Sequence, residues 1–170
     1  MKPFIWSVII LLALFVPCQI VNAARPPALC GANEKTVFLC HTKKKTVSLC
    51  AAGELMSGKG TLIYRFGQSM EAVELEYSNA PYRIREKFSL HVDTWAKGTS
   101  ITLSFNRQNL EYSVYHAHGV YGVDGGPNRA GVAVSQGSKE VSNIICDEES
   151  AVDNMYEVLT GIGLPAAQDY

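Results

Sequence analysis

The chain has 170 residues, of which 15 are Lys or Arg, 16 are Asp or Glu, and 47% are hydrophobic. This length and composition suit one globular domain with a hydrophobic core. Because the charges balance and the longest basic run is three lysines, we expect no binding to nucleic acid or to an anionic membrane surface.

The first 23 residues predict an export signal. Lys2 supplies a positive start, residues 4–16 are apolar, and small residues lead up to Ala23, as signal peptidase requires. The apolar segment is shorter than the about 20 residues of a membrane-spanning helix. Pro17, directly before Cys18, does not fit a lipoprotein processing site. We therefore expect a mature chain of residues 24–170, located in the periplasm or secreted, with no membrane attachment after cleavage.

Four cysteines remain in the mature chain: Cys30, Cys40, Cys50 and Cys146. They lack the close pairs of zinc ribbons, thiol redox motifs and haem attachment sites. An even number of cysteines in an exported chain predicts disulfides, here two. Cys40 and Cys50 are expected on the same side of one hairpin but on neighbouring strands, which disfavours a direct bond because the sulfur atoms must also satisfy a narrow torsion. The favoured pairs are Cys30–Cys40 and Cys50–Cys146, and the alternative pairs are Cys30–Cys50 and Cys40–Cys146.

Most of the mature chain alternates between apolar and polar residues, which is typical of half-buried β-strands. Turns rich in Gly, Asn, Asp, Ser and Lys separate these segments, and no helical pattern lies between them. The sequence therefore predicts a mainly β fold, an antiparallel sandwich or barrel of about nine strands. The predicted strands cover residues 36–40, 45–50, 61–67, 72–77, 87–93, 100–106, 110–118, 131–136 and 140–146.

One helix is predicted, at the carboxyl-terminal end. Asp147 is a suitable N-cap, and apolar residues recur at helical spacing over 152–159. Gly161, Gly163 and Pro165 would end the helix. A disulfide at Cys146 would attach it to the amino-terminal hairpin.

Two histidines are candidate metal ligands. Residues two apart on a strand point to the same face about 7 Å apart, so His116 and His118 can share a zinc or copper ion if a third ligand joins them. The candidates for that third ligand are His41, His91 and Asp93. The alternative is that both histidines continue the inner face of a strand as it leaves the core, partly exposed and hydrogen-bonded.

The glycine-rich segment after the histidines predicts a long binding loop, with Asp124, Asn128 and Arg129 as candidate contact residues. It lacks the Lys-Ser/Thr pair and the following helix of a phosphate-binding loop. The chain also lacks a G-x-S-x-G nucleophile motif and an H-E-x-x-H zinc motif. An enzymatic function is therefore not supported.

Two charged groups are interpreted as surface features. The three lysines at 43–45 predict a solvated hairpin tip. Arg65 opposite Glu74 and Glu76 predicts paired charges across a hairpin face, in preference to the carboxylate pair of a glycosidase.

Five segments occur in order between Cys30 and Cys146: VFLCHTKKKTVSLC, LIYRFGQ, VELEYS, YSVYHAHG and AGVAVSQGSKEVSNIIC. This arrangement resembles a group of small exported proteobacterial proteins of uncharacterized function. The resemblance implies no catalytic residues. A looser similarity, of architecture only, is to periplasmic lysozyme inhibitors and toxin-immunity proteins.

Two function classes follow. The first is an exported, non-enzymatic binding protein without a cofactor, an inhibitor or immunity protein acting on a periplasmic hydrolase or toxin. Its partner would be a periplasmic or envelope protein. The second is a metal- or small-ligand-binding periplasmic protein that uses His116 and His118, with zinc or copper as the ligand. The missing catalytic motifs and the long loop favour the first class.

Overall fold

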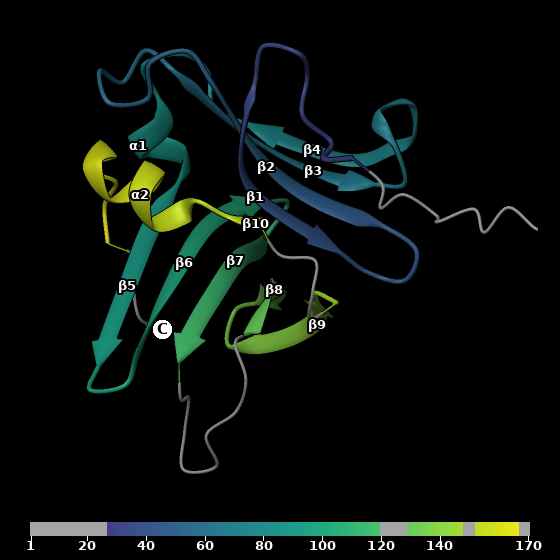
Figure 1. Ribbon diagram of the computed structural model, residues 1–170, viewed down its shortest axis with the longest axis vertical. Coiled ribbons are helices and arrows are strands. Elements are labelled where there is room, and N and C mark those ends of the chain that lie inside the picture. The colour runs from purple at the N-terminus through teal and green to yellow at the C-terminus, as the bar shows by residue number, and fades with distance from the viewer. Residues whose placement is uncertain (1–26, 120–128, 148–151, 167–170) are drawn as a thin grey trace, which may run out of the picture.

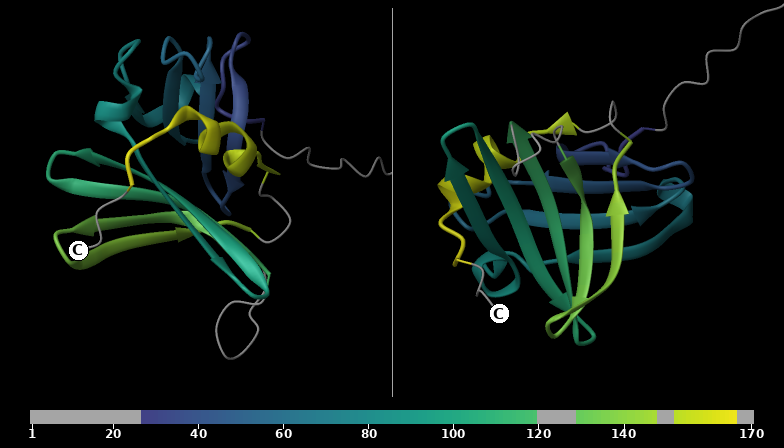
Figure 2. Two further views of the ribbon diagram at one scale, coloured as in Figure 1. Left: turned by 90° about the vertical axis from the view of Figure 1, so that its left-hand side faces the viewer. Right: turned by 90° about the horizontal axis from the view of Figure 1, so that it is seen from below.

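The computed structural model describes residues 27–119, 129–147 and 152–166 (Figure 1). It consists of two antiparallel five-stranded sheets, with strand orders β10-β1-β2-β3-β4 and β5-β6-β7-β8-β9. The strands of one sheet run across those of the other (Figure 2). The predicted mainly β fold is confirmed, and it is a sandwich of two crossed sheets.

All nine predicted strands are present, and β10 is an additional two-residue strand. The first sheet contains β1 (Lys35–His41), β2 (Thr46–Ala52), β3 (Thr61–Gly67), β4 (Val73–Ser78) and β10 (Val152–Asp153). The second contains β5 (Ser89–Trp95), β6 (Gly98–Arg107), β7 (Leu110–Gly119), β8 (Arg129–Gln136) and β9 (Lys139–Ile145). The helical elements are α1 (Ile84–Lys87), α2 (Met155–Leu159), and the 3-10 turns η1 (Met70–Ala72) and η2 (Thr160–Ile162).

The hydrophobic core lies between the two sheets. On β6, Ile101, Leu103 and Phe105 are buried, as the alternation of strand side chains requires. The ring of Phe105 stacks on Tyr77 and Tyr112, with centroid distances of 4.4 and 5.0 Å. Aromatic side chains from both sheets therefore fill the space between them.

The first hairpin differs from its prediction in one respect. β1 contains a register shift between Thr36 and Phe38, and Cys40 lies opposite Val47 and shares its face. Cys50 lies three residues after Val47 on β2, so its side chain points to the other face. Cys40 and Cys50 therefore point to opposite sides of the sheet, whereas the sequence predicted the same side.

This difference determines the disulfides. Cys50 bonds to Cys30, which belongs to the segment preceding β1, with a Cα–Cα distance of 5.6 Å. Cys40 bonds to Cys146, which follows β9 in the second sheet, with a Cα–Cα distance of 5.2 Å. The prediction of two disulfides is confirmed, the favoured pairs were wrong, and the alternative pairs are found. Two disulfides indicate an oxidising, extracellular compartment.

The carboxyl-terminal segment also differs from its prediction. The backbone N–H of Asp147 donates to the carbonyl of His41, and Asp153 pairs with Phe38 on β1. Because Val152 and Asp153 pair with β1 as a strand, the described helix starts only at Met155, and the predicted N-cap at Asp147 is wrong. The predicted end is confirmed, since Gly163 has a φ of 68° after η2.

The short helix α1 was not predicted. Its Ile84 is buried, and the Arg85 side chain donates to the carbonyl of Ile162 over 2.9 Å. Within the described residues, no helix has the length and apolar character needed to cross a membrane. The predicted export signal, residues 1–23, lies outside the described residues.

Candidate metal site

The inner face of β7 positions the two candidate histidines. Val114 and His116 are buried on this face, and His118 follows with about half of its side chain exposed (52%). The two imidazole rings lie 3.9 Å apart between centroids. The predicted common face is confirmed. His116, however, is more deeply buried than the partly exposed histidine of the alternative interpretation.

The third side chain of this site comes from the other sheet. Asp153 lies on β10, next to β1, and its side chain is only 9% exposed. Its Oδ2 atom hydrogen-bonds to Nδ1 of His116 and lies 3.6 Å from Nε2 of His118. Its Oδ1 atom accepts the backbone N–H of Met155 over 2.8 Å. One carboxylate therefore joins both histidines to the start of α2.

The environment keeps Asp153 in its charged form. Burial raises the pKa of this carboxyl group, but the hydrogen bonds from His116 and from the Met155 N–H, with the charges of the two imidazoles, outweigh burial. The net result is a lowered pKa. At neutral pH Asp153 is therefore a carboxylate, which is the form that binds metal ions.

The geometry suits a shared metal ion. One ligand atom from each of His116, His118 and Asp153 lies within 4.8 Å of the other two. Bonds of about 2.0–2.2 Å to a tetrahedral zinc ion place ligand atoms about 3.3 Å apart. Coordination through Nδ1 of His116 would replace its hydrogen bond to Asp153 and release the proton of that bond, and it would leave one coordination position for solvent or another ligand.

The predicted third ligands do not join this group. Nδ1 of His41 lies 3.2 Å from Oγ1 of Thr46. Nε2 of His91 lies 3.0 Å from Oδ2 of Asp93, its neighbour on β5. His41, His91 and Asp93 are thus absent from the ligand group, and Asp153 takes the place predicted for them.

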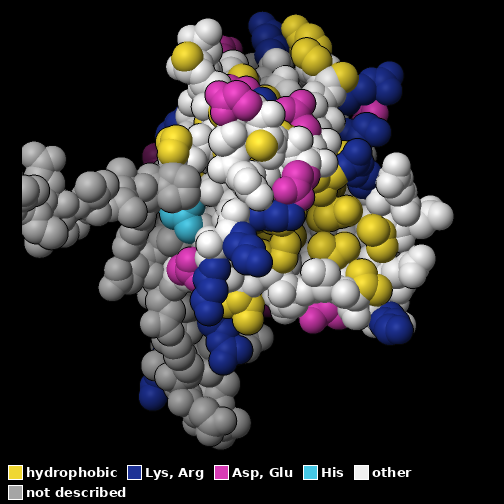
Figure 3. Space-filling model, turned by 90° about the vertical axis from the view of Figure 1, so that its right-hand side faces the viewer, with side chains coloured by type: hydrophobic (Ala, Val, Ile, Leu, Met, Phe, Trp, Pro, Cys, Tyr) yellow, Lys and Arg dark blue, Asp and Glu magenta, His cyan; other side chains and the backbone are white. Residues whose placement is uncertain are grey.

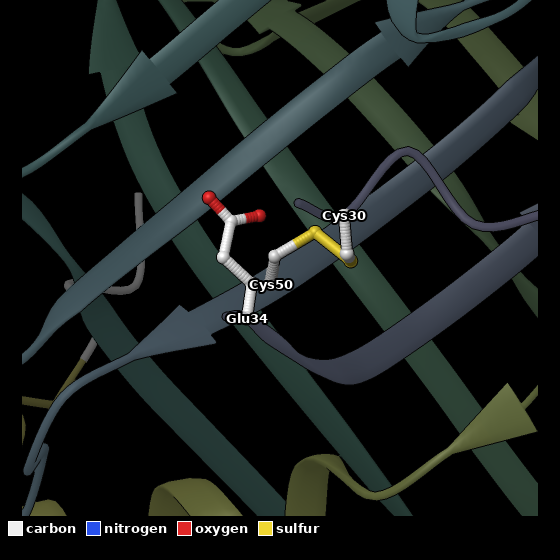
Figure 4. Close-up of side chains that lie close together, drawn as sticks. All are labelled: Cys30, Glu34 and Cys50. Carbon is white, nitrogen blue, oxygen red and sulfur yellow. A yellow bond between two sulfur atoms is a disulfide. The ribbon is translucent and has the colours of Figure 1, made fainter. Parts of the chain in front are cut away.

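A second group of ligand-type side chains is structural. Cys30, Glu34 and Cys50 lie close together, but the two sulfur atoms are bonded to each other (Figure 4). The carboxylate of Glu34 accepts two hydrogen bonds from Arg65, one of them from Nη2 to Oε1 over 3.0 Å. This contact with the guanidinium group is the largest cause of the lowered pKa of Glu34. No ligand atom of this group is left for a metal ion.

The contacts of Arg65 confirm part of its predicted pairing with Glu74 and Glu76. Its Nε atom donates to Glu76 over 2.7 Å, across the β3–β4 pair. Glu74 instead binds Lys45 over 2.6 Å. The predicted pairing of Arg65 therefore holds for Glu76, and a glutamate that the sequence did not single out, Glu34, is its second partner.

The predicted binding loop is described only at its end. Asp124 and Asn128 lie outside the described residues, and Arg129 is exposed at the start of β8. Arg129 borders a hollow of about 280 Å³ on the outer face of the second sheet, together with Ser100, Thr102, Tyr115 and Ala117. The binding role of this loop stays a prediction.

Comparison of the chain with known protein families, with curated proteins and with solved structures found no match. The function is therefore argued from the geometry of the site.

Proposed function

We propose that this protein binds a divalent transition metal, zinc or copper, in the periplasm or outside the cell. The observation that carries the proposal is the convergence of His116, His118 and Asp153, whose ligand atoms lie within 4.8 Å of one another. Imidazole and carboxylate groups are common ligands of zinc, and imidazole also suits copper. The lowered pKa of Asp153 supports the same function, because a charged carboxylate needs no deprotonation before it binds.

The two histidines would have different roles. His116 is buried and hydrogen-bonded to Asp153, so these two groups form a fixed half of the site. His118 is about half exposed, so a metal ion can reach the site from solvent on its side. A partly fixed and partly open site favours reversible binding, as in carriage or buffering of a metal.

Metal titration of the mature protein tests the proposal. Residues 24–170 are freed of metal with a chelator and titrated with zinc and with copper by calorimetry. We expect one ion per chain, and an affinity at least 100-fold lower in the His116→Ala, His118→Ala double variant. Asp153→Asn, which keeps the side-chain shape, should lower the affinity at least tenfold.

The chain offers a matched control. His91 and Asp93 form another histidine–aspartate pair, 3.0 Å apart, on β5. The His91→Ala, Asp93→Asn double variant should bind metal with unchanged affinity. If this control and the His116, His118 double variant lose affinity equally, the binding belongs to exposed histidines in general and the proposed site is wrong.

A second candidate is the exported, non-enzymatic inhibitor or immunity protein. It is supported by an exposed edge strand, β9, on a scaffold held by two disulfides. A stable one-to-one complex with a periplasmic hydrolase or toxin that loses its activity in the complex would support it. The His116→Ala, His118→Ala variant should keep that complex, whereas loss of the complex in this variant would make metal binding the primary function.

A further inference from the structure

The first observation is a hollow with an apolar floor and a basic rim. Its volume is about 430 Å³, and it is lined by Phe66 of β3, Ile144 and Ile145 of β9, Asp147, and residues 42–45 at the tip of the β1–β2 hairpin. Lys and Arg side chains lie beside hydrophobic ones on the face that Figure 3 shows. Ile145 is 64% exposed, which is unusual for a large apolar side chain beside other apolar groups.

The lysines of the rim differ in their partners. Lys45 binds Glu74 over 2.6 Å and lies 4.8 Å from the centre of the Phe66 ring. Lys43 and Lys44 are exposed, and within the described part of the chain neither has an acidic partner. Within the described residues, the rim therefore offers two unpaired positive charges next to an apolar floor, a combination that suits acidic and apolar groups together.

The second observation is the free edge of β9, which borders the hollow. Among the strands that the structure describes, β9 pairs only with β8. The N–H of Cys146 donates to the carbonyl of Ala130 over 2.9 Å, so alternation along the antiparallel pair turns the backbone groups of Asn143 and Ile145 to the free side. Most natural edge strands carry charges or proline that block further pairing. The charges of β9 lie at its start, Lys139 and Glu140, and residues 141–145 carry neither a charge nor a proline.

We propose that this surface binds an extended, acidic and apolar segment of a partner protein. The segment adds to the second sheet as a strand beside β9, so its backbone groups meet those of Asn143 and Ile145. Because strand side chains alternate, its apolar side chains can enter the hollow while acidic ones reach Lys43 and Lys44. This surface shares no residue with the metal site, and it gives the binding-protein candidate a defined contact surface along β9.

Other occupants fit the surface less well. Proteins held on anionic membranes by electrostatics use clusters of about 4–8 basic residues. Of the three lysines that line the hollow, only Lys43 and Lys44 have no acidic partner among the described residues, and Asp147 adds a carboxylate to the lining. A membrane would also leave the backbone groups of the β9 edge unpaired.

Synthetic peptides test the proposal. The probe is a fluorescent nine-residue peptide of alternating Asp and Val, titrated with the mature protein (residues 24–170) and followed by fluorescence anisotropy. We expect micromolar binding, and at least tenfold weaker binding of an alternating Lys and Val peptide. Two further peptides carry N-methyl groups, one on the Val amides and one on the Asp amides. Only one of these two should lose binding, because alternate amides of an added strand face β9.

Variants locate the binding surface. Lys43→Glu with Lys44→Glu should weaken binding of the acidic peptide at least tenfold, and Ile145→Ser should do so by a similar factor. Lys59→Glu with Lys87→Glu is the matched control, because it changes the same charge at two other exposed lysines and should leave binding unchanged. Thermal unfolding verifies that each variant is folded, and zinc affinity should be the same in all of them.

Several outcomes would overturn the proposal. One is binding of both N-methylated peptides as tightly as the parent, because then no strand is added. Another is capture of the protein by vesicles of anionic phospholipid when the acidic peptide does not bind. A third is a dimer in light scattering that Ile145→Ser converts to a monomer, which would assign this surface to a second copy of the chain.

Discussion

Within the described residues, two groups of side chains bring three ligand-type residues together, and they differ in how firmly their ligand atoms are held. In the Cys30, Glu34 and Cys50 group, the sulfur atoms are bonded to each other and the carboxylate is held by Arg65. In the His116, His118 and Asp153 group, His118 stays about half exposed and lies 3.6 Å from the shared carboxylate. Proximity of ligand-type residues therefore does not define a metal site. The deciding property is how firmly their ligand atoms are held: the sulfur atoms of Cys30 and Cys50 are covalently bonded, whereas a metal ion can replace the hydrogen bond between His116 and Asp153.

The two groups also connect different parts of the fold. The first joins the segment before β1 to the outer face of the first sheet, where Leu29 is buried and its N–H donates to Oγ of Ser48 over 2.9 Å. The second joins β10 of one sheet to β7 of the other. Loss of the first should therefore affect stability alone, whereas loss of the second should affect metal binding.

The largest expected effect is the loss of unfolding free energy when one of the two disulfides is removed. Cys40 and Cys146 are 106 positions apart, and Cys30 and Cys50 are 20 apart. In the chain-entropy account, replacing the first pair by alanine costs about 5 kcal/mol and replacing the second costs about 3 kcal/mol. Urea unfolding of the two double variants measures the difference. A larger loss for Cys30→Ala, Cys50→Ala would contradict it, and so would any change in zinc affinity in that variant.

Zinc should stabilise the protein through the group of His116, His118 and Asp153, and not through the group of Cys30, Glu34 and Cys50. At a free zinc concentration 100 times the dissociation constant, the free energy of unfolding should rise by about 2.7 kcal/mol. Thermal unfolding with and without zinc measures this gain. The Glu34→Gln variant should keep the gain and Asp153→Asn should lose it. The comparison of the two groups would fail if Glu34→Gln lost it instead.

Glu34→Gln should lower the free energy of unfolding by about 2 kcal/mol, because the buried guanidinium of Arg65 loses a charged partner. Glu74→Gln is the matched control, since Glu74 pairs with Lys45 and about half of its side chain is exposed (46%). The control should cost less than about 1 kcal/mol. Urea unfolding at neutral pH measures both, and equal costs would show that burial of the Arg65 contact is unimportant.

The smallest expected effect is a change in the stability contribution of Glu34 at acidic pH. The Arg65 guanidinium lowers the pKa of Glu34, so its contribution to stability is complete above the ordinary pKa of about 4.3 and is lost as the pH falls through the lowered value. The difference in unfolding free energy between wild type and Glu34→Gln should therefore be constant from pH 7 to about 5 and shrink below about 4. A difference that grows in acid would show the opposite sign of the pKa change.

The strands could be predicted because alternation of apolar and polar residues is local. In segments such as 100–106 and 110–118, the alternation alone shows which side chains face the core. The structure buries Ile101, Leu103, Phe105 and Val114 as expected. The disulfide pairs could not be predicted in the same way. The register of the first hairpin, in which His41 lies opposite Thr46 and Cys40 opposite Val47, has no evident signature in the sequence, yet it decides which face Cys40 occupies.

The metal site was half predictable for a related reason. His116 and His118 are two residues apart on one strand, so their common face follows from strand geometry. Asp153 is 37 positions from His116 and lies where the sequence predicted the interior of a helix. The pairing of β10 with β1 shortens that helix and places the aspartate at the site. The one local signal was weak: aspartate is favoured just before a helix, where Asp153 accepts the N–H of Met155.

The disulfide connectivity has a consequence for the order in which the chain can be oxidised. A chain that emerges amino terminus first presents Cys30 and Cys40 before either native partner, Cys50 or Cys146, is available. Oxidation in order of emergence would join Cys30 to Cys40, and that bond is absent from the folded protein. If the cysteines oxidise in that order, the native pairs form only by thiol–disulfide exchange after Cys146 has emerged, and a cell that lacks an isomerase should accumulate the protein in mispaired form.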